Sequence, residues 1–118
     1  MSDQLIQAQK CLRVVPQEHA FYCCDGQVFY SLEELYRGFQ QMDEQTFLYH
    51  SQRQRNDFAA WVEDIIGDGE LAQRLEKASQ DLKRACHELK KGIERWDRII
   101  EEVADKIAFE DKFFFFEF

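Results

Sequence analysis

Apolar residues in the second half of the chain recur every three or four positions, the spacing of one face of an α-helix. The pattern runs from residue 71 to residue 107 and predicts one long amphipathic helix over residues 69–108, capped by Asp68. Unbroken, this helix would be about 55 Å long at 1.5 Å per residue. A domain of roughly 60 residues is only about 25–30 Å across. We therefore expect part of the apolar stripe to extend beyond the domain.

Three interpretations of this stripe remain open. The favoured one is a self-associating coiled coil. Alternatively, the helix bends near Gly92 and folds back as a helical hairpin, or the stripe docks on a different protein. The steps along the stripe are irregular between Leu82 and Leu89. The expected oligomer seam consists of Leu82, Cys86, Leu89, Ile93, Trp96, Ile100, Val103 and Ile107.

The N-terminal half predicts a hairpin followed by short helices. Apolar, aromatic-rich runs at residues 21–24 and 27–30 flank Asp25 and Gly26, which predicts a two-residue turn with positive φ at both positions. Three short helices should follow. Their expected N-terminal caps are Ser31 (in a capping box with Glu34), Asp43 and Asn56, and Gly67 should end the third helix.

These elements predict an α+β fold that is mostly α: an N-terminal β-hairpin packed on three short helices, followed by a long C-terminal amphipathic helix. Residues 1–18 are expected to form a polar lead with at most one helical turn. Residues 19–78 should form the small domain, and residues 109–118 a Phe-rich tail. The aromatic residues of the domain are expected to form its core, because the segment has few of the basic neighbours that a base-stacking surface needs.

The tail contains five phenylalanines within six residues: Phe113, Phe114, Phe115, Phe116 and Phe118. Its composition is that of an aggregation-prone strand, so we expect something to cover it. A docking peptide that binds another protein is favoured. A third strand added to the hairpin and a disordered end remain alternatives.

Charge and composition limit the classes of partner that the protein can bind. The formal net charge is −8 and the apolar content is 45%, which argues against disorder and against nucleic-acid binding. The N-terminal residues lack the apolar stretch of a signal peptide, and no run of apolar residues is long enough to span a bilayer. We therefore expect a cytoplasmic protein with no membrane or nucleic-acid partner and with four reduced cysteines.

Candidate catalytic and metal-binding residues are few. His50, Asn56 and Asp57 could form a nucleophilic site with Cys23 or Cys24, but helix capping by Asn56 or Asp57 is the simpler interpretation. The possible metal ligands are His19, Cys11, Cys23 and Cys24. Adjacent residues on a strand point to opposite faces, which disfavours a shared ion, and no Cys-x-x-Cys spacing is present. We expect no metal, no cofactor and no catalytic residue.

The N-terminal domain resembles a small prokaryotic domain family of unknown function. The resemblance rests on Tyr49-His50 followed by Asn56-Asp57-Phe58-x-x-Trp61, together with Asp25-Gly26, in a segment of about residues 19–78. It implies a compact hairpin-plus-helices domain and no particular activity. The resemblance does not extend to the Phe-rich tail.

The sequence therefore predicts a non-enzymatic interaction or adaptor protein, or the cargo of a larger assembly. It would self-associate through its C-terminal helix and dock a protein partner through its tail. One alternative is a small enzyme or ligand-binding domain that uses His50, Asn56 and Asp57. Another is a regulatory or antitoxin-like subunit that is folded by its partner.

Overall fold

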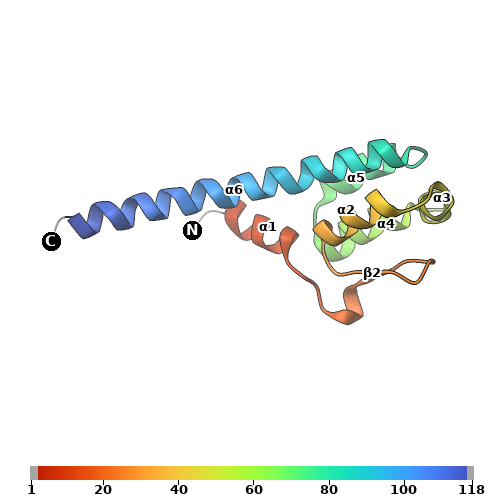
Figure 1. Ribbon diagram of the computed structural model, residues 1–118, viewed down its shortest axis with the longest axis horizontal. Helices are drawn as coiled ribbons and strands as arrows, with labels where there is room; N and C mark the ends of the chain where they lie inside the picture. Colours follow the sequence, from red (N-terminus) through yellow and green to blue (C-terminus); the bar gives the residue numbers. More distant parts are fainter. Residues whose placement is uncertain (1–2, 117–118) are drawn as a thin grey trace.

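The computed structural model describes residues 3–116, and the side chains of residues 3–107. It confirms a mostly helical α+β fold, in which a two-stranded hairpin and short helices pack against one long C-terminal helix (Figure 1). The elements in chain order are α1 (Asp3–Leu12), η1 (Gln17–His19), β1 (Phe21–Tyr22), β2 (Val28–Phe29), α2 (Leu32–Gln41), α3 (Glu44–Ser51), α4 (Asp57–Trp61), η2 (Val62–Ile66), α5 (Gly69–Lys77) and α6 (Leu82–Phe116).

The hairpin is antiparallel, with Phe21 opposite Phe29. Its turn differs from the predicted two-residue turn: only Gly26 has positive φ (93°), and the Gly26 N–H donates to the Cys23 carbonyl at 3.0 Å. The loop therefore has three residues, 24–26, with glycine at the left-handed position. Asp25 contributes through its side chain, which accepts from the Gln27 N–H at 3.0 Å.

The predicted helix starts are confirmed. The side chains of Ser31, Asp43, Asn56 and Asp68 each accept a hydrogen bond from the backbone N–H three residues ahead. Each thereby satisfies a donor that the first helical turn leaves free. Gly67 has φ 93° and ends the π-helical turn η2, as expected for a residue that closes a helix in the left-handed conformation.

The phenylalanines of the domain and Trp61 form the core, as predicted, whereas Tyr22 and Tyr49, which were also expected there, are exposed. Phe58 lies at its centre: its ring centroid is 4.9 Å from those of Phe21 and Phe39 and 5.7 Å from that of Phe47. Trp61, on the following turn, is 7% exposed and donates from Nε1 to the His19 carbonyl at 2.7 Å. One aromatic cluster thus joins the hairpin to α2, α3 and α4.

The polar lead is more structured than predicted. Helix α1 packs along α6, and it buries Leu5, Ala8 and Cys11 (Figure 1). Arg13, just after α1, donates to the carbonyl of Ile65 at 2.8 Å and to that of Ile66 at 3.3 Å, where η2 ends. Residues 3–15 are therefore part of the fold, since they cover one side of α6.

The single helix expected over residues 69–108 is wrong: two helices, α5 and α6, are separated by a turn at residues 78–81. Asp81 begins α6 by accepting from the Arg84 N–H at 3.1 Å. The turn is held from outside, because the Ser79 carbonyl accepts from Ser51 Oγ at 2.6 Å and from Gln52 Nε2 at 2.9 Å. The chain does fold back into a helical hairpin, but at this turn.

Gly92, the expected site of a bend, lies inside α6 at its approach to α5. A Cβ atom placed there would meet the Leu71 side chain at 3.0 Å. The glycine therefore allows α5 to pack closely against α6, and it does not interrupt the helix.

We predict that Trp61→Ala lowers the free energy of unfolding by about 3–5 kcal/mol, because it removes a large buried ring from the aromatic cluster. Trp61→Phe serves as the control: it keeps most of the ring volume and loses the hydrogen bond to His19, for about 1 kcal/mol. Urea unfolding followed by circular dichroism measures both. If Trp61→Ala were no more destabilising than Trp61→Phe, the ring would not be a core residue.

Candidate functional site

His50, at the end of α3, is the most enclosed titratable side chain of the predicted catalytic set. It is 6% exposed, and its ring makes edge contacts with the rings of Phe21 and Phe58 at centroid distances of 5.1 and 5.3 Å. Its Nε2 lies 3.0 Å from the backbone nitrogen of Cys24, and its Nδ1 lies 3.0 Å from Asp57 Oδ2. Because an amide N–H can only donate, Nε2 accepts, and neutral His50 carries its proton on Nδ1.

The predicted catalytic set is brought together only in part. Asp57, the first residue of α4, reaches His50 and also lies 3.5 Å from Arg53 Nε. Asn56 points elsewhere: its amide nitrogen donates to Ser79 Oγ at 3.0 Å and to the Leu75 carbonyl at 3.3 Å. Asn56 is therefore a helix cap that also ties α4 to the α5–α6 turn, and it makes no contact of this kind with His50.

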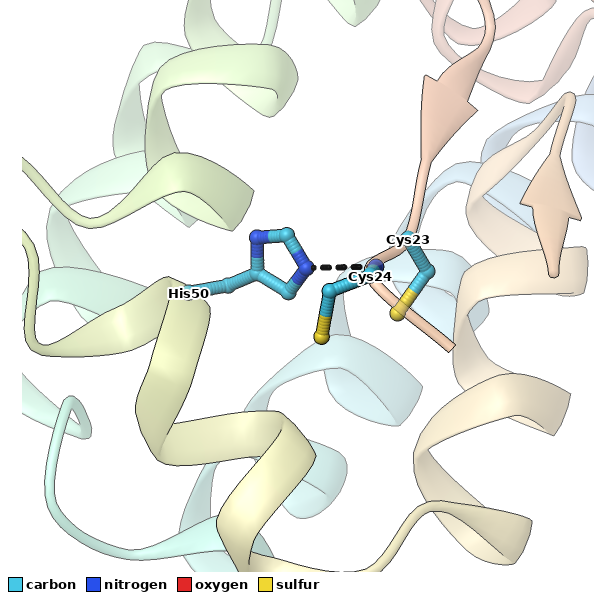
Figure 2. Close-up of side chains that lie close together, drawn as sticks. All are labelled: Cys23, Cys24 and His50. Atoms are coloured by element: carbon cyan, nitrogen blue, oxygen red, sulfur yellow. Dashed lines mark hydrogen bonds between the residues drawn. The ribbon is translucent and has the colours of Figure 1, made fainter. Parts of the chain in front are cut away.

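Two cysteines join the histidine. The Sγ atoms of Cys23 and Cys24 and a ring nitrogen of His50 all lie within 4.8 Å of one another (Figure 2). The strand argument against such a cluster does not apply, because β1 ends at Tyr22 and both cysteines belong to the loop side of the hairpin. Cys23 is buried and Cys24 is exposed. Burial raises the pKa of the Cys23 thiol to about 11.

The other predicted metal ligands are not part of this cluster. Cys11 lies in α1 and is buried next to Gln7, whose amide donates to its sulfur at 3.4 Å. His19 lies in η1, and its backbone carbonyl accepts the hydrogen bond from Trp61 Nε1. Sequence spacing could not find the cluster, because His50 reaches the cysteines only when α3 packs against the hairpin.

The Nε2 lone pair of His50 is already engaged, because it accepts the Cys24 N–H. Either a general base or a ligand of a bound ion would have to replace this hydrogen bond. An open hollow of about 400 Å³ beside Asp57 is lined by Arg53, Gln54, Arg55 and Asp57, and neither cysteine lines it. Another hollow, of about 480 Å³, lies between the end of α2 and the start of α6, away from His50.

The predicted oligomer seam divides into an inner and an outer part. Leu89 and Trp96 are buried in the core of the same chain, and Leu82, Cys86, Ile93 and Ile100 are half-buried against it. The chain's own helices cover Leu89 and Trp96 and cover the other four in part, so this part of the row is not a free seam. Beyond Ile100 the helix leaves the domain: Val103 is half-buried and Ile107 is 52% exposed. We call the part of α6 from residue 101 onward the C-terminal arm (Figure 1).

Helix α6 continues into the Phe-rich segment as far as Phe116, so this part of the tail is helical and is not a third strand of the hairpin. Figure 1 also shows the far end of α6 well away from β2. The side chains of Phe113, Phe114, Phe115 and Phe116, and the whole of Phe118, lie outside the described residues. Their predicted role in partner binding therefore stays a prediction.

We predict that alkylation of the native protein by N-ethylmaleimide modifies Cys24 first, Cys86 more slowly, and Cys23 and Cys11 last. Cys24 is exposed, whereas burial raises the pKa of the other three thiols and lowers their thiolate fraction. Peptide mass spectrometry at timed intervals measures the order, and the urea-unfolded protein is the control. Equal rates for Cys23 and Cys24 in the native protein would contradict the buried position of Cys23.

Comparison with known proteins identifies the family. The chain matches the model of a family of unknown function, DUF5752, over residues 14–118. No curated protein and no solved structure matches the chain. The family match is longer than the segment 19–78 on which the resemblance rests, because it includes α6 and the Phe-rich tail. The chain therefore belongs to DUF5752, a protein family of unknown function.

Proposed function

We propose that this protein is a non-enzymatic, cytoplasmic interaction protein that self-associates through its C-terminal arm and docks a protein partner through its Phe-rich tail. One observation carries the proposal: α6 is 35 residues long, and the domain covers it only as far as Ile100. The molecule extends 62 Å along its longest axis and 27 and 23 Å along the other two. A helix of this length does more than complete the core.

The arm carries a continuation of the apolar row of α6. Val103 and Ile107 follow Ile100 at three- and four-residue steps, so they share its helix face. In the described part of the arm the other side chains are charged, apart from Ala104, and all of these are exposed. A narrow apolar row between charged flanks is the pattern by which helices pair, so we assign the arm to a second copy of this chain.

Charge and hydropathy favour protein as the partner class. The net charge of −8 opposes binding to phosphate backbones and to anionic lipid surfaces. Within the described residues, no helix combines the length and the apolar character needed to cross a bilayer. The four cysteines are free thiols, as expected for a reducing compartment.

The tail is assigned to a different protein. It begins near the end of a helix that projects from the domain, so it lies at a distance from the chain's own core and is accessible to a partner. Five phenylalanines within six residues form an apolar segment that would promote association if left in water. Capture in a hydrophobic groove of a partner covers such a segment.

The enzyme or ligand-binding alternative is supported by the His50–Asp57 pair beside two thiols. Asn56 does not support this alternative, because its side chain caps α4. The third alternative, a regulatory subunit folded by its partner, applies at most to the arm, because residues 3–100 form a packed core without one.

We predict that the protein self-associates at tens of micromolar and that Ile107→Glu raises the dissociation constant at least about tenfold, because a half-exposed isoleucine on each copy loses its burial. Ala104→Glu is the matched control, since it adds the same charge to an exposed position of the same arm. Sedimentation equilibrium of the full chain measures both. A monomeric parent, or equal effects of the two substitutions, would contradict self-association through the apolar row.

For the tail, we predict that deletion of residues 113–118 leaves the melting temperature within a few degrees of the parent but abolishes capture of the partner by affinity purification. It should also improve solubility. Replacement of the five phenylalanines by serine, which keeps the chain length, should have the same effects. A lower melting temperature together with faster hydrogen exchange at residues 21–30 would instead mean that the tail packs on the hairpin.

A further inference from the structure

The geometry of the hairpin turn points to a metal site: we propose that Cys23, Cys24 and His50 form a three-ligand site for Zn²⁺ whose fourth coordination position is open. The site is independent of the proposed interaction function, since none of its residues lies in α6. It rests on two observations: the mutual proximity of the three ligand atoms (Figure 2), and the hydrogen bond between His50 and Asp57 that orients the histidine.

The first observation is distance. Zn²⁺ binds Cys sulfur at about 2.3 Å and His nitrogen at about 2.0–2.1 Å in a tetrahedron, so neighbouring ligand atoms lie roughly 3.4–3.8 Å apart. The three atoms here lie within 4.8 Å of one another. The remaining difference is at most about 1.4 Å, which is small beside the displacement of Sγ in a rotamer change. Cys24 is exposed and can make this change without moving the buried Cys23.

The second observation is the orientation of the imidazole. Nδ1 of His50 donates to Asp57 Oδ2 at a nitrogen–oxygen distance of 3.0 Å, so the lone pair of His50 is on Nε2, the nitrogen that faces the hairpin turn. A carboxylate behind a ligating histidine is the usual arrangement at zinc sites, because it fixes the tautomer and the ring. Arg53, 3.5 Å from the same carboxylate oxygen, and the rings of Phe21 and Phe58 restrain this arrangement further.

Binding competes with one existing hydrogen bond. The Nε2 lone pair accepts the Cys24 N–H in this structure, and coordination would replace that bond. The donor belongs to an exposed loop residue and can turn to water. Coordination therefore breaks one neutral hydrogen bond and releases the two thiol protons to water, and it forms two zinc–thiolate bonds and one zinc–imidazole bond.

The ligand set selects the class of ion. Two thiols and an imidazole suit Zn²⁺ and disfavour Mg²⁺ and Ca²⁺, which require oxygen ligands. The nearby carboxylate of Asp25 is engaged with the Gln27 N–H. Exposure of Cys24 leaves the ion accessible from solvent, so water or a group of an external ligand would complete the tetrahedron.

The test titrates the reduced full-length protein with Co²⁺ and records the absorption spectrum. Zn²⁺ is then added, and its affinity is measured by competition with a chromophoric chelator. We expect one equivalent of tetrahedral Co²⁺, a charge-transfer band with the intensity of two thiolates, and displacement of Co²⁺ by Zn²⁺. Cys24→Ala, at an exposed position that tolerates the change, should weaken Zn²⁺ binding at least about tenfold, and Asp57→Asn by roughly 10–100-fold. Cys86→Ala, a cysteine of α6 outside the cluster, is the matched control and should bind like the parent.

The proposal is overturned if Co²⁺ shows no thiolate charge transfer, if Cys24→Ala binds Zn²⁺ as tightly as the parent, or if Cys86→Ala weakens binding equally. Circular dichroism of each variant establishes that it is folded. Because His50→Gln would remove a buried partner of the hairpin, the conclusion rests on Cys24→Ala and on the two-thiolate spectrum.

Discussion

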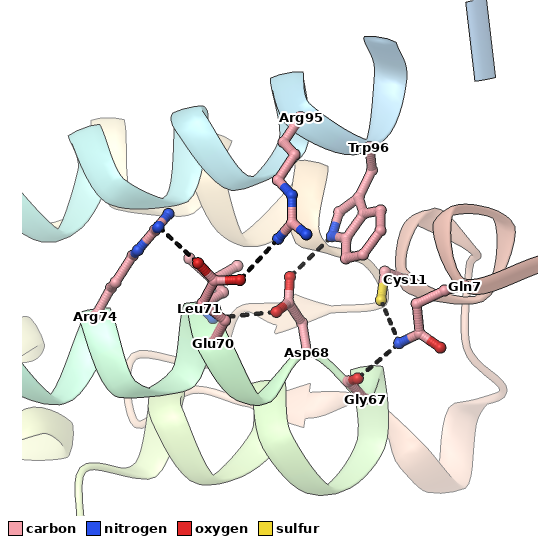
Figure 3. Close-up of polar contacts among 9 residues, drawn as sticks. All are labelled: Gln7, Cys11, Gly67, Asp68, Glu70, Leu71, Arg74, Arg95 and Trp96. Atoms are coloured by element: carbon pink, nitrogen blue, oxygen red, sulfur yellow. Dashed lines mark hydrogen bonds and ion pairs between the residues drawn. The ribbon is translucent and has the colours of Figure 1, made fainter. Parts of the chain in front are cut away.

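The architecture depends on the carboxylate of Asp68, which is 5% exposed. One oxygen accepts from the Leu71 N–H at 3.0 Å and caps α5; the other accepts from Trp96 Nε1 at 2.8 Å, on α6 (Figure 3). A buried carboxylate is costly unless it is hydrogen-bonded, so both donors are required at once. Its neighbour Gly67 supplies the left-handed turn and a carbonyl that accepts from Gln7 of α1 at 2.9 Å. Four elements are thereby joined at two consecutive residues.

This junction separates the two candidate functional regions. It fixes α6 against α1 and α5, and so directs the arm away from the domain. The hairpin and α3, which hold Cys23, Cys24 and His50, are instead joined through the aromatic cluster, where His50 contacts Phe21 and Phe58. On the surface of α5, Glu70 pairs with Arg74 at 2.8 Å and with Arg95 at 3.0 Å, which adds a weaker polar link between the helices. Chemistry at the turn and association at the arm can therefore be altered separately.

Local signals predicted much of this fold, and tertiary contacts explain what they missed. Caps at Ser31, Asp43, Asn56 and Asp68 are read from neighbouring residues, and all four formed. The break before α6 also had local signals, namely Asp81 as a cap and the irregular step after Leu82. The apolar row continues across the break, however, and this continuity favoured the prediction of a single helix. The residue types suggested His50 with Cys23 or Cys24 as a possible nucleophilic set, but no local signal brought them together, because residues 26 positions apart meet only after α3 packs on the hairpin.

The projection of α6 also makes it a lever. At 1.5 Å per residue, the segment from Glu101 to Phe116 reaches about 24 Å beyond the last residue that packs on the core. A rotation of roughly ten degrees about Trp96 would displace Phe116, about 30 Å away along the helix, by about 5 Å. The indole of Trp96 is held by Asp68 and covered by the Arg95 guanidinium at 4.7 Å from the ring centroid. The rigidity of this anchor, together with the packing of α6 on α1, α2 and α5, sets how accurately the end of the helix is positioned in space.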